Sequence, residues 1–211
     1  MLETKITNTI KQAKMIKKFF LPFLLLITTS TFAQIDASKP EGLKVGDVAP
    51  AIAGTDQNGN KIMLSEILKN GPAVLIFYRG QWCPYCNKQL SQLNDSLSLI
   101  TEKKGTVLTI TPETTDNIKK TVEKTKASFS IVEDKGLAIM KAYKVNFAVD
   151  EKTIKKYKGY GIDFEKANGD NGANLPVPAT YVVGTDGKIK YVFFNADYSK
   201  RASVNEIVSN L

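Results

Sequence analysis

The pattern of apolar and polar positions predicts alternating strands and helices. Residues 73–78 form a continuous apolar run, which favours a central strand in a sheet that is covered on both faces. Apolar residues then recur at helical spacing from Leu90 to Ile100, and Gly105 is expected to end that helix. The β-rich run 106–111 predicts the next strand.

The chain continues this alternation for another sixty residues. We expect a helix from Pro112 to about Lys126, a strand at 129–132 and a short helix at 137–143. A polar stretch with four glycines, residues 150–174, follows, and only a helical turn near 151–157 is expected within it. Such a long irregular insertion in a compact domain is usually functional or mobile.

Two turns predict β-hairpins. Asp186-Gly187 lies between the β-rich runs 181–183 and 189–193, and a second turn at 56–61 contains Asn58-Gly59. A short helix is expected at 65–68 and a closing helix at 202–211. This order of elements predicts an α/β fold with a central mixed β-sheet and helices on both faces.

The first 33 residues have the order of a secretory signal peptide. Basic residues precede an apolar run, and small residues lead to Ala33, after which we expect cleavage. The alternative is an uncleaved membrane anchor, although the run is shorter than the ~20 residues that span a bilayer. We therefore expect export to the periplasm or the extracellular space, with 34–44 as a linker and 45–211 as one domain.

Composition narrows the chemistry. The chain of 211 residues has a net charge of +8 but no histidine, which excludes Ser-His and Cys-His catalysis. Half of that charge lies in the first 33 residues, where five lysines oppose one glutamate. The remaining lysines are scattered among acids, as on a solvated surface, so nucleic-acid binding is not expected.

The two cysteines of the chain, Cys83 and Cys86, lie where the central strand gives way to a helix. A helix N-terminus stabilises a thiolate and lowers the thiol pKa. We expect Cys83 to be the exposed nucleophile and Cys86, one turn deeper, to resolve a mixed disulfide. Pro84 suits the first helical turn. The alternatives are a zinc site, which would lack further ligands, a structural disulfide, which would close too small a loop, and buried inert thiols.

Four segments carry a resemblance to a known family. Residues 71–87 include Trp-Cys-Pro-Tyr-Cys, and the segments 45–50, 133–143 and 175–181 agree with it. Together they resemble the peroxiredoxin-like branch of the AhpC/TSA family, in the thioredoxin superfamily. The resemblance implies a thioredoxin-like fold and a cis peptide bond at Val177-Pro178 that faces the cysteines. The site neighbourhood that it implies consists of Arg79, Trp82, Pro84, Tyr85 and Pro178.

The sequence departs from both better-known patterns of that superfamily. Alignment on Cys86 as the peroxidatic cysteine puts Arg79, Cys83 and Pro178 where peroxiredoxins have Pro, Thr or Ser, and Arg. Phe77 stands where thioredoxin has a buried acid, so proton transfer at Cys86 must use water or another group. Arg79 either stabilises a thiolate or is a solvated charge at the end of the strand.

Three functions remain open at this point. The first is a thiol–disulfide oxidoreductase, and the second is a thiol-dependent hydroperoxide reductase with Cys86 or Cys83 as the peroxidatic residue. The third is a non-catalytic binding module that uses the insertion 150–174. The expected partners are a thiol or disulfide protein, as substrate or reductant, and for the second function a hydroperoxide. We expect neither a cofactor nor a metal.

Overall fold

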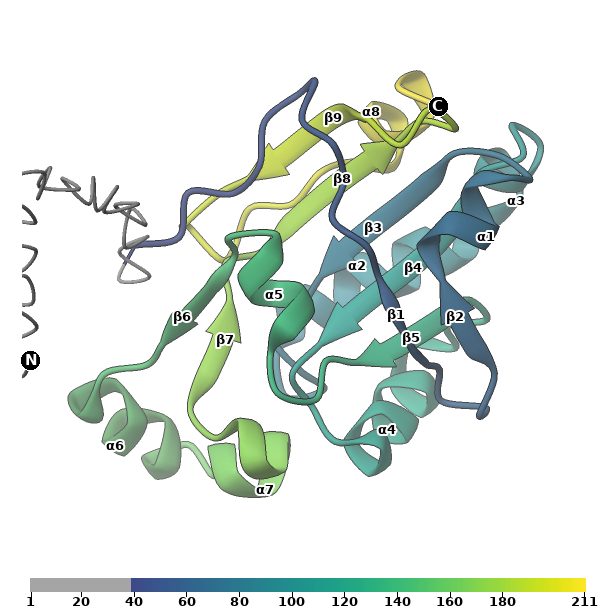
Figure 1. Cartoon of the computed structure of the whole chain (residues 1–211). Helices are drawn as coiled ribbons and strands as arrows, with labels where there is room; N and C mark the ends of the chain where they lie inside the picture. Colours follow the sequence, from purple (N-terminus) through teal and green to yellow (C-terminus); the bar gives the residue numbers. More distant parts are fainter. Residues whose placement is uncertain (1–38) are drawn as a thin grey trace, which may run out of the picture. The chain divides into compact units, whose positions relative to one another are not determined.

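The computed structural model describes residues 39–211. Its centre is a five-stranded sheet in the order β5-β4-β3-β8-β9 (Figure 1). The strands are β3 (Ala73–Phe77), β4 (Thr106–Thr111), β5 (Ser130–Glu133), β8 (Ala179–Val183) and β9 (Ile189–Phe194). β4 runs parallel to β3 and β5, whereas β8 is antiparallel to β3 and β9. The expected mixed sheet is confirmed.

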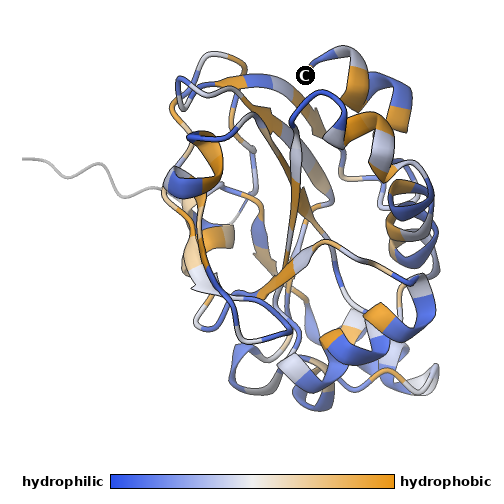
Figure 2. Cartoon of the chain, turned by 90° about the vertical axis from the view of Figure 1, so that its right-hand side faces the viewer, coloured by the Kyte–Doolittle hydropathy of each residue, from blue (hydrophilic) through white to orange (hydrophobic). Residues whose placement is uncertain are grey.

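Helices cover both faces of this sheet, as the apolar run of β3 predicts. Leu75 and Phe77 of β3 pack on one face, and Val74 and Ile76 on the other. The first face carries α1 (Leu64–Leu68) and α5 (Ala138–Ala142). The second carries α2 (Pro84–Asp95), α3 (Leu97–Thr101), α4 (Thr115–Thr125) and α8 (Val204–Ser209). Figure 2 shows the apolar strands between helices of mixed hydropathy.

The helix that follows the cysteines is interrupted. The sequence predicts one helix up to Gly105, but it breaks at Ser96 into α2 and α3. The break does not disturb burial, because Leu93 before it and Ile100 after it both belong to the same apolar cluster. The helical spacing of the leucines therefore identified the buried face correctly but not the break.

The insertion is more regular than its composition predicts. Within 150–174 the chain forms two helices and a 3-10 turn, and two short strands join antiparallel at its base. These elements are β6 (Asn146–Ala148), α6 (Glu151–Gly159), α7 (Phe164–Asn168), the turn Gly169–Asn171 and β7 (Asn174–Pro176). Val149, Phe164 and Leu175 give it a small core of its own. It lies at the lower left of Figure 1.

The segment before the sheet packs against the domain. The hairpin of β1 (Ala53–Thr55) and β2 (Lys61–Met63) forms as expected. Gly42 and Leu43, in the expected linker, already donate backbone hydrogen bonds to Lys144 O at 3.0 Å and Tyr181 OH at 3.2 Å. The expected signal peptide, 1–33, and linker residues 34–38 lie outside the described residues. None of the helices between residues 39 and 211 is long and apolar enough to cross a membrane.

The peptide bond at Val177-Pro178 corrects an expectation. It is trans, as is every peptide bond of the described residues, rather than cis. β7 leads into this bond as an extended strand, and Val177 N–H donates to Val145 O at 2.8 Å. Pro178 directly precedes Ala179, which pairs with Phe77 at the end of β3. The proline therefore lies at the sheet edge where the central strand ends.

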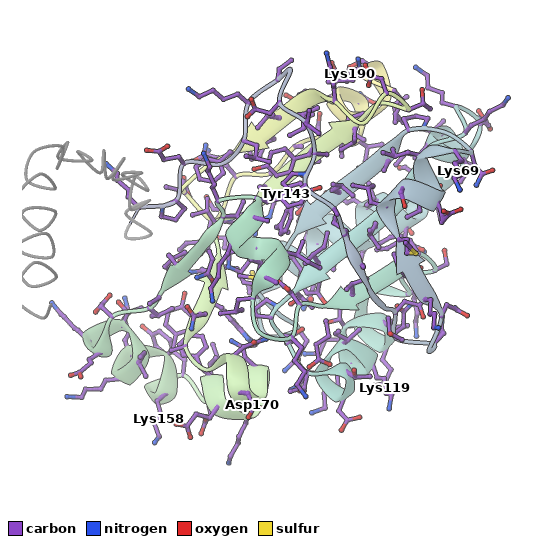
Figure 3. All side chains as sticks on the ribbon, viewed as in Figure 1. Lys69, Lys119, Tyr143, Lys158, Asp170 and Lys190 are labelled. Atoms are coloured by element: carbon purple, nitrogen blue, oxygen red, sulfur yellow. The ribbon has the colours of Figure 1, made fainter. Side chains whose placement is uncertain are left out.

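The charged surface is solvated, as the scattered lysines predict. Figure 3 shows the Lys69, Lys119, Lys158 and Lys190 side chains at the outside of the fold. The three ion pairs within residues 39–211 are all exposed lysine–carboxylate pairs. Exposed pairs of this kind stabilise a fold by at most about 1 kcal/mol each. Charges that bear on function must therefore be sought among the buried groups.

Candidate active site

The two cysteines lie at the start of α2, at one edge of the sheet. Cys83 is the N-cap of this helix and Pro84 occupies its first position, as expected. The backbone N–H of Cys86 donates to Cys83 Sγ at 3.3 Å. Both residues are free thiols in this structure, so the structure describes the reduced pair.

Both cysteines are buried. Cys86 has no exposed surface, and Cys83 is only 2% exposed. The expectation of an exposed Cys83 is therefore wrong, because its side chain packs in the same apolar cluster as Tyr78 and Leu90. Cys83 is still the outer member of the pair, and a partner would meet it first.

An arginine far along the chain contacts the inner cysteine. Arg201 Nη2 donates to Cys86 Sγ at 3.3 Å. The other amino group, Nη1, is held by the backbone carbonyls of Tyr198 and Lys200. Arg201 is not predicted from the sequence, since it lies 115 residues after Cys86 in an irregular segment between β9 and α8. No local pattern predicts which residue of such a segment turns back to the site.

The two thiols differ in acidity, with the pKa of Cys83 raised and that of Cys86 lowered. Burial alone would raise the pKa of Cys86, but the hydrogen bond from the Cys83 thiol, the charge of Arg201 and the Arg79 backbone N–H outweigh it. They lower the pKa of Cys86 to about 6. Donating that hydrogen bond raises the pKa of Cys83 well above its ordinary value, and burial adds to the effect. The lowered pKa that the sequence predicts at Cys83 is thus found at Cys86.

A buried carboxyl group lies close enough to influence this pair. Glu113 has no exposed surface. Its Oε1 accepts from Gln81 N–H at 2.7 Å and its Oε2 accepts from Thr121 Oγ1 at 3.3 Å. Burial raises the pKa of Glu113 to about 7, against the effect of these hydrogen bonds, and the charge of Cys86 also raises it. Glu113 can therefore gain or lose a proton near neutral pH.

The sheet topology explains why Glu113 is near the cysteines. β3 and β4 are parallel, with Phe77 opposite Ile110, so both strands end at the same edge of the sheet. Ligand and catalytic groups collect at such carboxyl ends in open α/β sheets. From the sequence, Glu113 is expected only at the start of a helix. The signal that could have identified it is an acid two residues after β4, the strand that pairs with β3, since β3 leads to the cysteines.

Arg79 differs from both expectations. It is not a solvated charge, since only 7% of it is exposed. Its guanidinium lies over the Tyr198 ring, 4.7 Å from the centroid, and Nη1 donates to Tyr157 OH at 3.2 Å. It is the Arg79 backbone N–H that lowers the pKa of Cys86. The guanidinium is thus free for another role.

Two further expected site residues, Trp82 and Tyr85, pack against other aromatic rings. Trp82 packs edge-on against Tyr157 and Phe164, with ring centroids 5.4 and 5.8 Å apart. Tyr85 is exposed and lies edge-on to Tyr198 at 5.9 Å. Within residues 39–211, no cluster of three or more histidine, cysteine or acidic side chains could hold a metal ion.

Known proteins match most of the domain. Residues 45–192 match the AhpC/TSA family. The thiol-disulfide oxidoreductase ResA of Bacillus cereus is 31% identical over 130 residues, which cover 58% of this chain and 74% of that protein. A putative peroxiredoxin, bcp, of Buchnera aphidicola is 35% identical over 104 residues, or 49% of this chain and 65% of that protein.

The fold is also found among solved structures. Peroxidoxin BcpB from Mycobacterium tuberculosis superposes with a TM-score of 0.62 and 19% identity, covering 80% of this chain and 96% of that one. The expected thioredoxin-like fold and the expected enzyme class, an oxidoreductase, are confirmed. With the family match extending over residues 45–192, the chain belongs to the AhpC/TSA family.

Proposed function

We propose that this chain is a thiol–disulfide oxidoreductase that works through Cys83 and Cys86. The observation that carries the proposal is a buried pair of thiols at a helix start, with the Cys86 N–H on the outer sulfur and Arg201 on the inner sulfur. Similarity to a protein named as a thiol-disulfide oxidoreductase supports it. Only a thiolate attacks a disulfide efficiently, and the pair holds one at neutral pH.

The first step makes the outer sulfur the nucleophile. When a substrate disulfide reaches Cys83, the proton of Cys83 passes along its hydrogen bond to the Cys86 thiolate. Cys83 Sγ then attacks one substrate sulfur, the substrate S–S bond breaks, and the leaving thiolate takes a proton from solvent. The product of this step is a mixed disulfide between Cys83 and the substrate, with Cys86 as a thiol.

The second step releases the substrate. Glu113, with a pKa of about 7, accepts the proton of Cys86, and Arg201 stabilises the thiolate that results. Cys86 Sγ attacks Cys83 Sγ, and the second substrate thiolate leaves with the proton from Glu113. Two electrons pass from the cysteine pair to the substrate, which leaves as a dithiol. Another thiol protein must then reduce the Cys83–Cys86 disulfide.

Serine substitutions test the two roles separately. Turnover of a disulfide substrate should fall at least a hundredfold in Cys83→Ser. In Cys86→Ser the first step remains, so the mixed disulfide should accumulate and be visible by mass spectrometry under non-reducing conditions. Equal turnover by the wild type and Cys83→Ser would end the proposal.

The contact between Arg201 and Cys86 also favours a second candidate, the reduction of hydroperoxides. A Cys86 thiolate with a pKa near 6 could attack a peroxide oxygen, break the O–O bond and become a sulfenic acid. Cys83 would then condense with it to form the disulfide and release water. Stopped-flow oxidation by hydrogen peroxide tests this candidate, and a rate no faster than that of free cysteine would exclude it.

Export to an oxidising compartment suits such an enzyme, and we retain it as part of the proposal. It rests on the order of basic, apolar and small residues in 1–33. Expression with the full N-terminus, followed by N-terminal sequencing of the protein outside the cytoplasm, tests it. The mature chain should begin after Ala33, and full-length protein retained in the cytoplasm would contradict export.

A further inference from the structure

Arg79 is a buried cation without an acidic partner among the described residues. It is 7% exposed, and none of the three ion pairs within residues 39–211 includes it. A charge that has been removed from water is costly unless an opposite charge or several hydrogen bonds compensate for it. A single hydrogen bond, to Tyr157 OH, compensates only part of that cost.

The free side of the guanidinium has a specific geometry. Nη1 is occupied by Tyr157. Nε is buried without a hydrogen-bond partner among the described residues, and Nη2 makes no hydrogen bond within residues 39–211. In a planar guanidinium the N–H groups of Nε and Nη2 point the same way. Two parallel donors of this kind match the two oxygens of a carboxylate.

Aromatic rings from three segments hold this guanidinium in place. Tyr198 stands 4.7 Å from it, and Trp82 and Tyr157 stand 5.9 and 6.0 Å away. Cation–π contacts fix the plane of the group without using its N–H donors. The position of the donors is therefore set before any ligand arrives, which reduces the entropy that binding costs.

The neighbouring arginine is not available in the same way. Arg201 uses Nη1 on two backbone carbonyls and Nη2 on Cys86 Sγ. Within the described part of the chain, Arg79 uses only Nη1, on Tyr157, keeps Nε and Nη2 free, and lies four residues before Cys83. The exposed rings of Tyr85 and Tyr198 lie on the solvent side of this region. An anionic group that binds Arg79 would thus sit beside the substrate's reacting disulfide.

We propose that Arg79 binds a carboxylate that the substrate carries next to its disulfide. This inference rests on the proposed thiol–disulfide exchange and names a substrate class for it, disulfides flanked by an acidic group. The carboxylate binds side-on to Nε and Nη2 of the guanidinium that the aromatic rings hold in place. Cys83 then attacks the substrate sulfur next to this carboxylate. α6, which supplies Tyr157, connects the insertion to this choice of substrate.

Two matched peptides test the proposal. Both are closed by an internal disulfide, and one has glutamate next to its first cysteine where the other has glutamine. The wild type should reduce the glutamate peptide about tenfold faster in kcat/KM, and the ratio should fall as salt is added. The ratio should fall to about one in Arg79→Met and to an intermediate value in Arg79→Lys, which keeps the charge but not the fork. The exposed Lys88 on α2 provides a matched control, since Lys88→Met should keep the wild-type ratio.

The outcomes separate this inference from the function on which it rests. Equal rates in the wild type for the two peptides, and also for glutathione disulfide and its carboxyl ester, would overturn the carboxylate site even if both substituted proteins failed to fold. An unchanged ratio in a folded Arg79→Met would overturn it as well. Reduction of neither peptide, nor of any other disulfide, would instead contradict the proposed function. Glutathione disulfide and its carboxyl ester form a second pair. An Arg79-dependent preference confined to that pair would assign the carboxylate to a small thiol rather than to a protein.

Discussion

Arg201 and Cys86 are 115 residues apart in the chain and in contact at the site, with Nη2 3.3 Å from Sγ. A cation at this distance stabilises the thiolate but not the thiol, so it lowers the pKa of Cys86. Once Cys86 is part of a disulfide, its sulfur carries no charge, and the electrostatic attraction to Arg201 is lost. Arg201 therefore stabilises the reduced enzyme over the oxidised one, which makes the pair a better oxidant.

Removal of Arg201 should raise the pKa of Cys86. In Arg201→Met the thiolate loses its cation, and the pKa should rise from about 6 by about 1 to 2 pH units. Thiolate absorbance near 240 nm, followed as a function of pH, measures this without access to the buried sulfur. Lys88→Met removes an exposed charge on α2 that takes no part in the contact between Arg201 and Cys86, and its titration should match that of the wild type. The same titration midpoint in Arg201→Met and the wild type would contradict the assigned role.

Glu113→Gln should change the pH dependence of turnover. The wild-type rate should rise with pH around 7, because Glu113 must be ionised to accept the proton of Cys86. Glutamine keeps hydrogen-bonding atoms but cannot accept this proton, so the limb near pH 7 should disappear and turnover should fall about 10- to 100-fold. Glu123→Gln, on the exposed side of α4, is the matched control. An unaltered pH profile in Glu113→Gln would leave water as the proton acceptor.

The same carboxyl group should make stability depend on pH. The pKa of Glu113 is raised from its ordinary 4.5 to about 7 by burial, so the native state binds its proton more tightly than the unfolded state does. The stabilisation is complete below about pH 4.5 and is lost as the pH rises through 7, with a total of ~3 kcal/mol at ~1.4 kcal/mol per pH unit. Urea denaturation of the reduced protein at pH 5 and pH 8 measures it. Glu113→Gln should lose that part of the difference, and an equal difference in both proteins would be the contrary result.

The fold could be predicted largely because its signals are local. The apolar run 73–78 identified the central strand, and Asp186-Gly187 identified the hairpin of β8 and β9. The short strands β6 and β7 could not be predicted, because they have no local signal. β6 and β7 have three residues each, too few for a period to be visible, and they form by pairing with each other across the whole insertion.

The site could be predicted only in part, because its electrostatics come from distant segments. Cys83, Pro84 and Cys86 take their expected places at a helix start. The lowered pKa of Cys86 depends on Cys83 and on the distant Arg201. The proton acceptor that we propose, Glu113, follows β4 rather than standing in the central strand, where Phe77 lies. Arg201 has no local sequence signature. The position of Glu113 near the cysteines, in contrast, follows from the strand order once the sheet is known. Burial of Arg79 depends on Tyr157 and Tyr198, from two segments far apart in the chain.

Gln89 offers a test of the packing beneath the site. It lies on the buried face of α2, one turn after Cys86, and neither its amide oxygen nor its amide nitrogen has a hydrogen-bond partner among the described residues. Leaving a buried polar group unpaired costs about 1–3 kcal/mol. Methionine has a similar length and no such group, so Gln89→Met should raise the free energy of unfolding by about 1–2 kcal/mol. Gln92→Met, on the exposed side of the same helix, should change it by less than about 0.5 kcal/mol. Urea denaturation of both variants measures the difference. Destabilisation by Gln89→Met would mean that the amide is paired in solution, by water for example, and that its polar atoms support the helix that carries Cys86.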